Sequence, residues 1–311
     1  MSHPPHVSVL RDEVIEALAP RSDGRYVDCT TGHGGHCRAI MEQADAQAWI
    51  IGLDADPQAL EIARSNLAPW HDRITLVNSN FERIGSVVRE HQFAPVDGII
   101  IDLGWSSSQM ADAERGFSFQ IAGPLDMRFS PDQSVTAGEL VNTLDERDLA
   151  TLIWRYGEER QSRRIARAIV AKRPIEGTTD LAGIIERVMG RRQKIHPATR
   201  TFQALRIAVN DELGVLERTL EQLPDLLAPA GVIAVISFHS LEDRIVKQFF
   251  RRESVECICP PEAPICTCNH RPRLDWKPRK PTLPSREEIV ANPRARSAKL
   301  RIARKRSETP Q

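Results

Sequence analysis

The chain has 311 residues, 41% of them hydrophobic, with 42 basic and 42 acidic side chains. This length allows one large domain or two modest ones, and 17 Gly and 21 Pro exclude collagen-like and Pro/Gly-rich disordered chains. Apolar runs are short, such as Val232 to Ile236, which excludes a membrane span of about 20 residues. No signal peptide is visible, so we expect a soluble cytoplasmic protein.

The net charge of zero hides an uneven distribution. Residues 1–150 carry 11 Lys and Arg against 23 Asp and Glu, whereas residues 151–311 carry 31 against 19. This separation favours a small-molecule site in the first half and a polyanion-binding surface in the second. A chance excess of solvated charge is the alternative.

The first hundred residues alternate strand and helix patterns, which predicts a parallel sheet with helices on its faces. We expect strands at Tyr26–Cys29, Trp49–Leu53, Ile74–Val77 and Val96–Ile101, and helices at Cys37–Gln43 and Pro57–Leu67. The nearly continuous apolar run before Asp102 is typical of a strand covered on both faces.

From about residue 134 to 223 the periodicity is helical. One helix is expected to be capped by Asp145 before it and Gly157 after it, and another to end at Gly190. The strand pattern returns at Val232–Ser237, and a helix at Ser285–Val290 and a strand at Lys299–Ala303 follow. The chain is therefore predicted to be an α/β protein with an all-helical domain, residues 111–205, inserted between residues 1–110 and 206–311.

A Gly-rich turn, residues 28–36, follows the first strand and precedes a helix, a context in which backbone can approach a nucleotide closely. Asp54 ends the second strand, where an acidic side chain can accept hydrogen bonds from ribose hydroxyls. An NAD-type fingerprint would need a Gly three residues after Gly34, and the chain has none there. Asp28 at the strand end suits a cationic or zwitterionic ligand, such as S-adenosylmethionine. A tight turn without a ligand is the alternative.

Two more polar residues follow strands at the carboxyl edge, where ligands bind in open α/β sheets. Asp102 can bind the adenine amine of a cofactor or an amino group of the substrate, or it can cap the next turn. His239 can take up a proton or position a polar substrate group, or it can be a buried structural histidine. A Ser-His-Asp hydrolase is disfavoured, because no Gly-x-Ser-x-Gly elbow is present.

Two groups of basic residues lie in the helical region. The first forms one stripe at helical spacing: Arg160, Arg163, Arg164 and Arg167. The second follows in a loop: Arg191, Arg192, Lys194 and Arg200. Phosphate binding would explain both groups, and a solvated helix face paired to Glu158 and Glu159 is the alternative.

Four cysteines near the C-terminus are close in sequence: Cys257, Cys259, Cys266 and Cys268, with His270 nearby. They can bind tetrahedral zinc, but the usual spacing is Cys-x-x-Cys rather than Cys-x-Cys, so free thiols or adventitious metal remain open and we assign no metal site. Basic residues that can add to a polyanion-binding surface follow: Arg271, Arg273, Lys277, Arg279 and Lys280.

Taken together, these motifs resemble those of the bacterial ribosomal RNA small subunit methyltransferase H family (MraW-like), over nearly the whole chain. The segments that carry the resemblance are residues 28–36, 102–107, 112–119, 123–128, 156–160, 196–203, 237–243 and 292–297. The resemblance implies a Rossmann-like class I methyltransferase sheet with an inserted helical domain. It also implies an S-adenosylmethionine-dependent enzyme that methylates the N4 amine of a cytidine in the decoding region of 16S ribosomal RNA.

The resemblance carries cofactor contacts to positions of this chain. They are the glycine-loop residues Gly34, Gly35 and His36, the acidic residue Asp54, the aromatic residue Phe81, and Asp102 and Gln109 around the fourth strand. The loop departs at Cys29 and Thr31, where many relatives carry Gly and Phe. The resemblance further implies 16S ribosomal RNA within the small subunit as partner, and it leaves a homodimer open.

The N4 lone pair of cytosine is conjugated with the ring, so methyl transfer needs acceptors against the N4 protons and in-line positioning. Enzymes that methylate such amines often use an Asp/Asn-Pro-Pro-aromatic turn, but residues 102–105 read Asp-Leu-Gly-Trp. We therefore take His239 as the candidate catalytic residue. Trp105 can stack on an unstacked base or belong to the core. Methylation of another amine, on DNA or a small molecule, and a ribosome-assembly factor with bound S-adenosylmethionine are the competing functions.

Overall fold

The structure, a computed structural model, describes residues 8–105, 109–110, 112–190, 195–260, 262–263 and 265–307. The chain divides into two compact units, each described by itself. The sheet unit comprises Met1–Gly104 and Val215–Gln311, and the helical unit is Trp105–Gly214. The sequence placed these boundaries at 110/111 and 205/206, so the helical unit is longer at both ends than expected.

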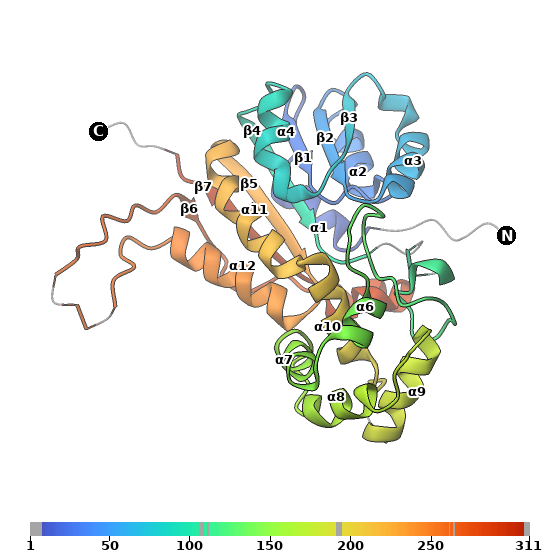
Figure 1. The fold of residues 1–311 in the computed structure, drawn as a ribbon. Coiled ribbons are helices and arrows are strands. Elements are labelled where there is room, and N and C mark those ends of the chain that lie inside the picture. The colour runs from blue at the N-terminus through green and yellow to red at the C-terminus, as the bar shows by residue number, and fades with distance from the viewer. Residues whose placement is uncertain are drawn as a thin grey trace. The chain divides into compact units, whose positions relative to one another are not determined.

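The sheet unit is built on a seven-stranded sheet in the order β3-β2-β1-β4-β5-β7-β6 (Figure 1). The strands are β1 (Arg25–Asp28), β2 (Trp49–Asp54), β3 (Ile74–Asn78), β4 (Val96–Asp102), β5 (Leu227–Ser237), β6 (Leu274–Asp275) and β7 (Lys299–Lys305). The first five strands in this order are parallel, whereas β7 runs antiparallel to both of its neighbours. The strands of the first hundred residues are parallel, as predicted, and the antiparallel β7 makes the whole sheet mixed. Strand order reverses beside β1, the position where open α/β sheets bind ligands.

Helices cover both faces of this sheet. They are α1 (Arg11–Leu18), α2 (Gly35–Gln43), α3 (Pro57–Asn66), α4 (Ile84–Glu90), α11 (Glu212–Leu226) and α12 (Ser240–Glu253); a further short helix of the unit, α13 (Arg286–Ala291), has no buried residue. Adjacent residues of β4 face opposite layers, because side chains alternate along a strand. Ile99 packs in the layer with α4, α11 and α12, and Ile100 packs in the layer with α1, α2 and α3. Both side chains are fully buried, as the apolar run predicts.

The helical unit contains α6 (Ala137–Thr143), α7 (Glu146–Gly157), α8 (Ser162–Val170), α9 (Thr178–Met189) and α10 (Thr199–Asn210). Asp145 caps α7, since its carboxylate accepts the backbone N–H of Asp148, and Gly190 is the C-cap of α9, as expected. The expectation that Gly157 follows the helix is wrong, because Gly157 is its last residue. A Cβ there would lie 2.5 Å from the Arg200 carbonyl oxygen, so close approach of α10 requires the glycine.

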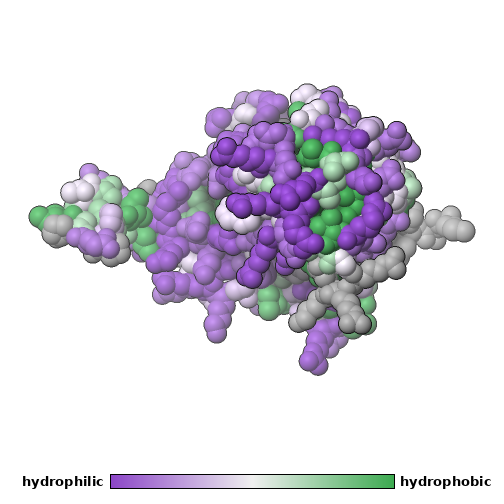
Figure 2. All heavy atoms as spheres, turned by 60° about the horizontal axis from the view of Figure 1, so that its bottom comes forward, coloured by the Kyte–Doolittle hydropathy of each residue, from purple (hydrophilic) through white to green (hydrophobic). Residues whose placement is uncertain are grey.

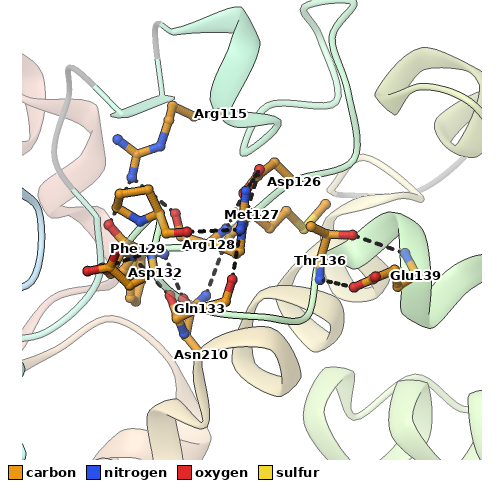
Figure 3. A network of polar contacts seen from close by, with 12 residues as sticks. Arg115, Asp126, Met127, Arg128, Phe129, Asp132, Gln133, Thr136, Glu139 and Asn210 are labelled. Atoms are coloured by element: carbon orange, nitrogen blue, oxygen red, sulfur yellow. Dashed lines mark hydrogen bonds and ion pairs between the residues drawn. The ribbon is translucent and has the colours of Figure 1, made fainter.

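A polar network fastens the loop that precedes α6 to the end of α10 (Figure 3). The guanidinium of Arg128 donates to both carboxylate oxygens of Asp126, at 3.0 and 2.7 Å, and to two backbone carbonyls farther along the loop. Asn210 accepts the N–H of Phe129 and donates to the Met127 carbonyl, both at 2.8 Å. The family-like segment 123–128 therefore has a structural role within the helical unit.

Candidate functional site

The Gly-rich turn is held rigidly between β1 and α2. The carboxylate of Asp28, fully buried, accepts the Thr30 N–H at 3.1 Å and the Cys37 thiol at 3.3 Å. Gly34 has φ +85°, and a Cβ there would lie 2.8 Å from Cδ1 of Leu67. A side chain at this position is thus excluded both by the backbone conformation and by packing.

Helix α2 starts directly after this turn. Its N-cap is Gly34, which provides no side-chain cap for the N–H groups of the first turn. Such N–H groups, aided by the helix dipole, bind carboxylate or phosphate groups. A Cβ on Gly35 would lie 2.0 Å from Oγ of Ser8, so this end of the helix is closely packed.

Asp54, at the end of β2, is tied to the turn. One carboxylate oxygen accepts the N–H of Gly32 at 2.8 Å and the other accepts the N–H of Asp56 at 2.9 Å. Burial raises the pKa of Asp54 to about 6, against the effect of these two hydrogen bonds. Each oxygen keeps a further acceptor direction, so the side chain can still accept from a pair of hydroxyl groups.

Asp102, at the end of β4, lies beside His36. Its Oδ2 is 3.5 Å from Nε2 of His36, and its backbone N–H donates to Oγ1 of Thr30 at 2.6 Å. Burial alone would lower the pKa of His36, but the hydrogen bond and charge of Asp102, with the charge of Asp28, raise it. Among the described residues, Oδ1 of Asp102 and Nδ1 of His36 are buried without a hydrogen-bond partner. Unsatisfied buried polar atoms of this kind fit the contact site of a polar ligand.

Two further cofactor residues are expected from the sequence, Phe81 and Gln109. Phe81 is half-buried on a short 3-10 helix after β3, where part of its ring packs on the sheet core. Gln109 is buried in the helical unit, so its grouping with the sheet-unit residues stays a prediction. Of the seven expected positions, three lie in the Gly-rich turn itself: Gly34, Gly35 and His36. Two more, Asp54 and Asp102, are hydrogen-bonded to the turn.

His239 is engaged in capping α12. Its Nδ1 accepts the N–H of Glu242 at 3.4 Å, and the Glu242 carboxylate accepts the N–H groups of Phe238 and His239 at 2.8 and 3.2 Å. Its Nε2 lies 3.1 Å from Oε1 of the same glutamate. These contacts support the alternative of a structural histidine. The catalytic role of His239 stays a prediction.

Trp105 lies at the start of the helical unit, beside Arg206. The Arg206 guanidinium covers the indole ring at 4.1 Å from its centroid and is fixed by two hydrogen bonds to Glu212, at 2.6 and 2.8 Å. The indole is nevertheless 37% exposed. Trp105 is therefore not a core residue, and its exposed part is available for contact. The neighbouring Ser106 and Ser107 lie outside the described residues.

The arginine stripe lies on the exposed face of α8 and just before it. Arg167 reaches Glu146 at 3.4 Å, and Arg164 donates to the Val188 carbonyl at 3.2 Å. The buried carboxylate of Glu159 pairs instead with Arg200, at 3.2 Å. Arg160 and Arg163 are exposed and make no ion pair with any other residue that the structure describes. Arg191, Arg192 and Lys194 lie outside the described residues.

One face of the molecule is drawn by residue hydropathy in Figure 2. On the face drawn in Figure 2, hydrophilic residues predominate and apolar residues form local patches. In the described part of the chain, no helix combines the length and the apolar character that crossing a membrane requires.

The fold and the site define a class of protein. A Rossmann-like sheet that joins a Gly-rich turn after β1 to acidic residues ending β2 and β4 is the architecture of class I methyltransferases. The chain belongs to the MraW methylase family, whose model matches residues 3–306.

Relatives cover nearly the whole chain. Proteins named ribosomal RNA small subunit methyltransferase H are 51% identical in Dehalococcoides mccartyi, over 97% of this chain and 87% of the relative, and 52% identical in Heliobacterium mobile, over 96% and 98%. The protein of that name in Thermomicrobium roseum is 52% identical, over 96% and 93%. A solved rRNA methylase from Streptococcus thermophilus aligns with TM-score 0.43 and 10% identity, over 96% and 94% of the two chains.

Proposed function

We propose that this protein transfers a methyl group from S-adenosylmethionine to the N4 amine of a cytidine in the decoding region of 16S ribosomal RNA. The observation that carries the proposal is that hydrogen bonds join the Gly-rich turn to Asp54 and Asp102. The chain is also about half identical to proteins named ribosomal RNA small subunit methyltransferase H. A protein of this kind works in the cytoplasm, on the small subunit or its RNA.

The residues at the sheet edge fit this cofactor. The N–H groups that begin α2 are suited to its carboxylate, and the two oxygens of Asp54 to its ribose hydroxyls. The half-buried ring of Phe81 can stack on adenine, and the unpartnered Oδ1 of Asp102 can accept from an amine. When bound, the cofactor supplies an electrophilic methyl group on a sulfonium. Gln109 completes the proposed set.

The protein must orient the N4 amine and accept its proton. The N4 lone pair becomes nucleophilic when acceptors bound to the N4 protons hold the amine in a geometry that takes the lone pair out of conjugation with the ring. The oxygens of Asp102 and the imidazole of His239 are the candidate acceptors, and His239 is proposed as the catalytic one. Its Nδ1 caps α12, whereas its Nε2 is buried without a hydrogen-bond partner among the described residues and is the atom proposed to face the substrate amine.

The helical unit is proposed to bind the RNA. Arg160 and Arg163 are exposed without ion-pair partners among the described residues, as phosphate-binding arginines are before their ligand arrives. The exposed part of Trp105 offers a ring on which an unstacked base can lie. A small-molecule methyltransferase would have no use for either feature.

The test is methylation of small ribosomal subunits from cells that lack this gene. Purified protein and methyl-labelled S-adenosylmethionine are added, and the RNA is digested to nucleosides and separated. We expect the label in N4-methylcytidine from the decoding region. Label in another nucleoside would contradict the proposed target.

A binding measurement separates the competing functions. If S-adenosylmethionine binds but no RNA is labelled, transfer to DNA or to small amines identifies an enzyme with another substrate. If nothing is labelled while the protein still binds the subunit, the assembly-factor function is favoured. The control is Asp54→Ala, which we expect to lose cofactor binding and all transfer together.

A further inference from the structure

The loop between α12 and β6 extends away from the helix and the strand that it connects (Figure 1). None of its described residues from 254 to 272 is buried, and Ile258 and Ile265 are 47% and 75% exposed. Fixing the backbone costs about 1–2 kcal/mol per residue, which loops normally offset by burying apolar side chains. This loop must be stabilised in another way.

The base of the loop is well anchored. The backbone N–H of Arg273 donates to the Glu253 carbonyl at 2.9 Å, and its side chain donates to the Glu253 carboxylate at 2.6 Å. A ring nitrogen of His270 lies 2.8 Å from the carbonyl oxygen of Arg252. These contacts close the loop but do not order its outer part.

The outer part of the loop gathers four thiols, Cys257, Cys259, Cys266 and Cys268, here called the cysteine cluster. Their sulfur atoms all lie within 4.8 Å of one another. Three of the separations are 3.5 Å (Cys257 to Cys266), 3.5 Å (Cys266 to Cys268) and 3.9 Å (Cys257 to Cys268). Because none of the loop's described residues is buried, the cluster is the feature that joins its two halves.

These separations match one kind of site. Four sulfurs at about 2.3 Å from a tetrahedral zinc ion lie about 3.8 Å apart. A disulfide would need about 2.05 Å, and a multi-iron cluster places several atoms between its cysteine ligands. The three observed sulfur separations, 3.5, 3.5 and 3.9 Å, lie on either side of this zinc value.

The Cys-x-Cys spacing is compatible with a single ion in this loop. In non-helical backbone, side chains two residues apart can lie on one face, and the intervening Ile258 and Thr267 are exposed. Backbone N–H groups lie near two of the sulfurs: that of Cys259 near Cys257, and those of Ile258 and His270 near Cys268. Four thiolates around Zn²⁺ leave a net charge of −2, which such N–H donors offset.

We propose that the cysteine cluster binds one structural Zn²⁺. Four protein sulfurs complete a tetrahedral shell and leave no position for water, so the ion is structural and not catalytic. It cross-links the two halves of the loop and thereby orders the segment that leads to Leu274 and Trp276, which are buried in the sheet unit. The proposal is independent of the methyltransferase function.

The first test is the metal content of the full-length protein, purified without a metal-affinity column and without chelators. We expect one zinc per chain by elemental analysis, and less than a tenth of that in Cys257→Ser and Cys268→Ser. The matched control is Ile258→Ala, which changes an exposed residue between two ligands and should keep its zinc. Wild-type protein without zinc, or with iron in its place, would overturn the proposal.

A second test distinguishes metal binding from oxidation and misfolding. Denatured without reductant, the protein should show six reactive thiols, since the structure has six free cysteines. Four or fewer would indicate a disulfide and overturn the proposal. Replacing zinc with Co²⁺ should give thiolate-to-metal charge-transfer bands and the visible bands of a tetrahedral ion.

The structural role has its own readout. After zinc is removed, limited proteolysis should cleave between residues 254 and 272, while circular dichroism of the rest of the protein stays unchanged. A loop that resists protease equally with and without zinc would contradict a structural role for the ion.

Discussion

The backbone N–H of Gly32 donates to Oδ2 of Asp54 at 2.8 Å and so joins the Gly-rich turn to the end of β2. Two segments that are separate in the sequence thereby meet at one edge of the sheet. Because burial raises the pKa of Asp54 to about 6, its charge state changes close to neutral pH.

The first prediction concerns the pH dependence of cofactor binding. Asp54 should accept hydrogen bonds from ribose hydroxyls best when it is ionised, so the affinity for S-adenosylmethionine should weaken as pH falls from 7 to 5, with a midpoint near 6. Calorimetric titration across that range measures it. Asp54→Ala should bind at least tenfold more weakly and lose this dependence. A wild-type affinity that does not change with pH would contradict the proposed role.

The same group affects stability with a defined sign. Its pKa in the folded state lies above the unfolded value, so the folded protein binds the proton more tightly. The Asp54 contribution to the free energy of unfolding is therefore fully present below pH 4 and is lost as pH rises to about 6. Urea denaturation of wild type and Asp54→Ala at pH 4.5 and pH 7 (about 2.5 pH units apart) measures this, and the wild type should lose more stability over that interval than the variant.

The second prediction compares a glycine that has no room for a side chain with one that has. Gly34→Ala should destabilise the protein by about 2 kcal/mol and weaken cofactor binding, because its φ is +85° and its Cβ would contact Leu67. Gly183→Ala, inside α9, meets nothing closer than 3.6 Å and should stabilise by about 0.5–1 kcal/mol. Chemical denaturation measures both. Equal effects of the two substitutions would show that the turn is not constrained as described.

The third prediction tests the network in Figure 3. Burial alone would raise the pKa of Asp126, but hydrogen bonds and the charge of Arg128 lower it overall. Its contribution to stability is therefore present above about pH 4 and lost as pH falls through the lowered pKa. Asp126→Asn should cost about 1–3 kcal/mol at pH 7 and less at pH 3. The control is Asp132→Asn, an exposed neighbour, which should change stability by less than about 0.5 kcal/mol.

The strands could be predicted from the sequence because their apolar runs are local features. The first residues of β5 were missed, since Pro229 and Gly231 look like turn residues. In the structure the strand continues through them, and its pairing with β4 shifts register between Val96 and Gly98. The two-residue strand β6 has too little pattern to be recognised.

The site could be predicted in part. Asp54 and Asp102 were found because each ends an apolar run, and parallel strands bring such ends to one edge. The contact between His36 and Asp102 was not predicted, nor was the Arg206 guanidinium over Trp105, because both depend on tertiary packing. Likewise, the sequence indicated that Gly157 ends a helix, whereas in the structure a glycine is required there because the Arg200 carbonyl leaves no room for a side chain.

The last prediction concerns the arginine stripe. Arg163→Glu with Arg167→Glu should weaken binding of small-subunit RNA at least tenfold and reduce the slope of log affinity against log salt concentration by about 1–2. Affinity for S-adenosylmethionine should not change, since α8 belongs to the helical unit and the Gly-rich turn to the sheet unit. The matched control reverses two exposed arginines of the sheet unit, Arg64→Glu with Arg89→Glu, for the same change in net charge. If both double variants bind RNA equally weakly, the effect comes from total charge, and the stripe is not the RNA-binding surface.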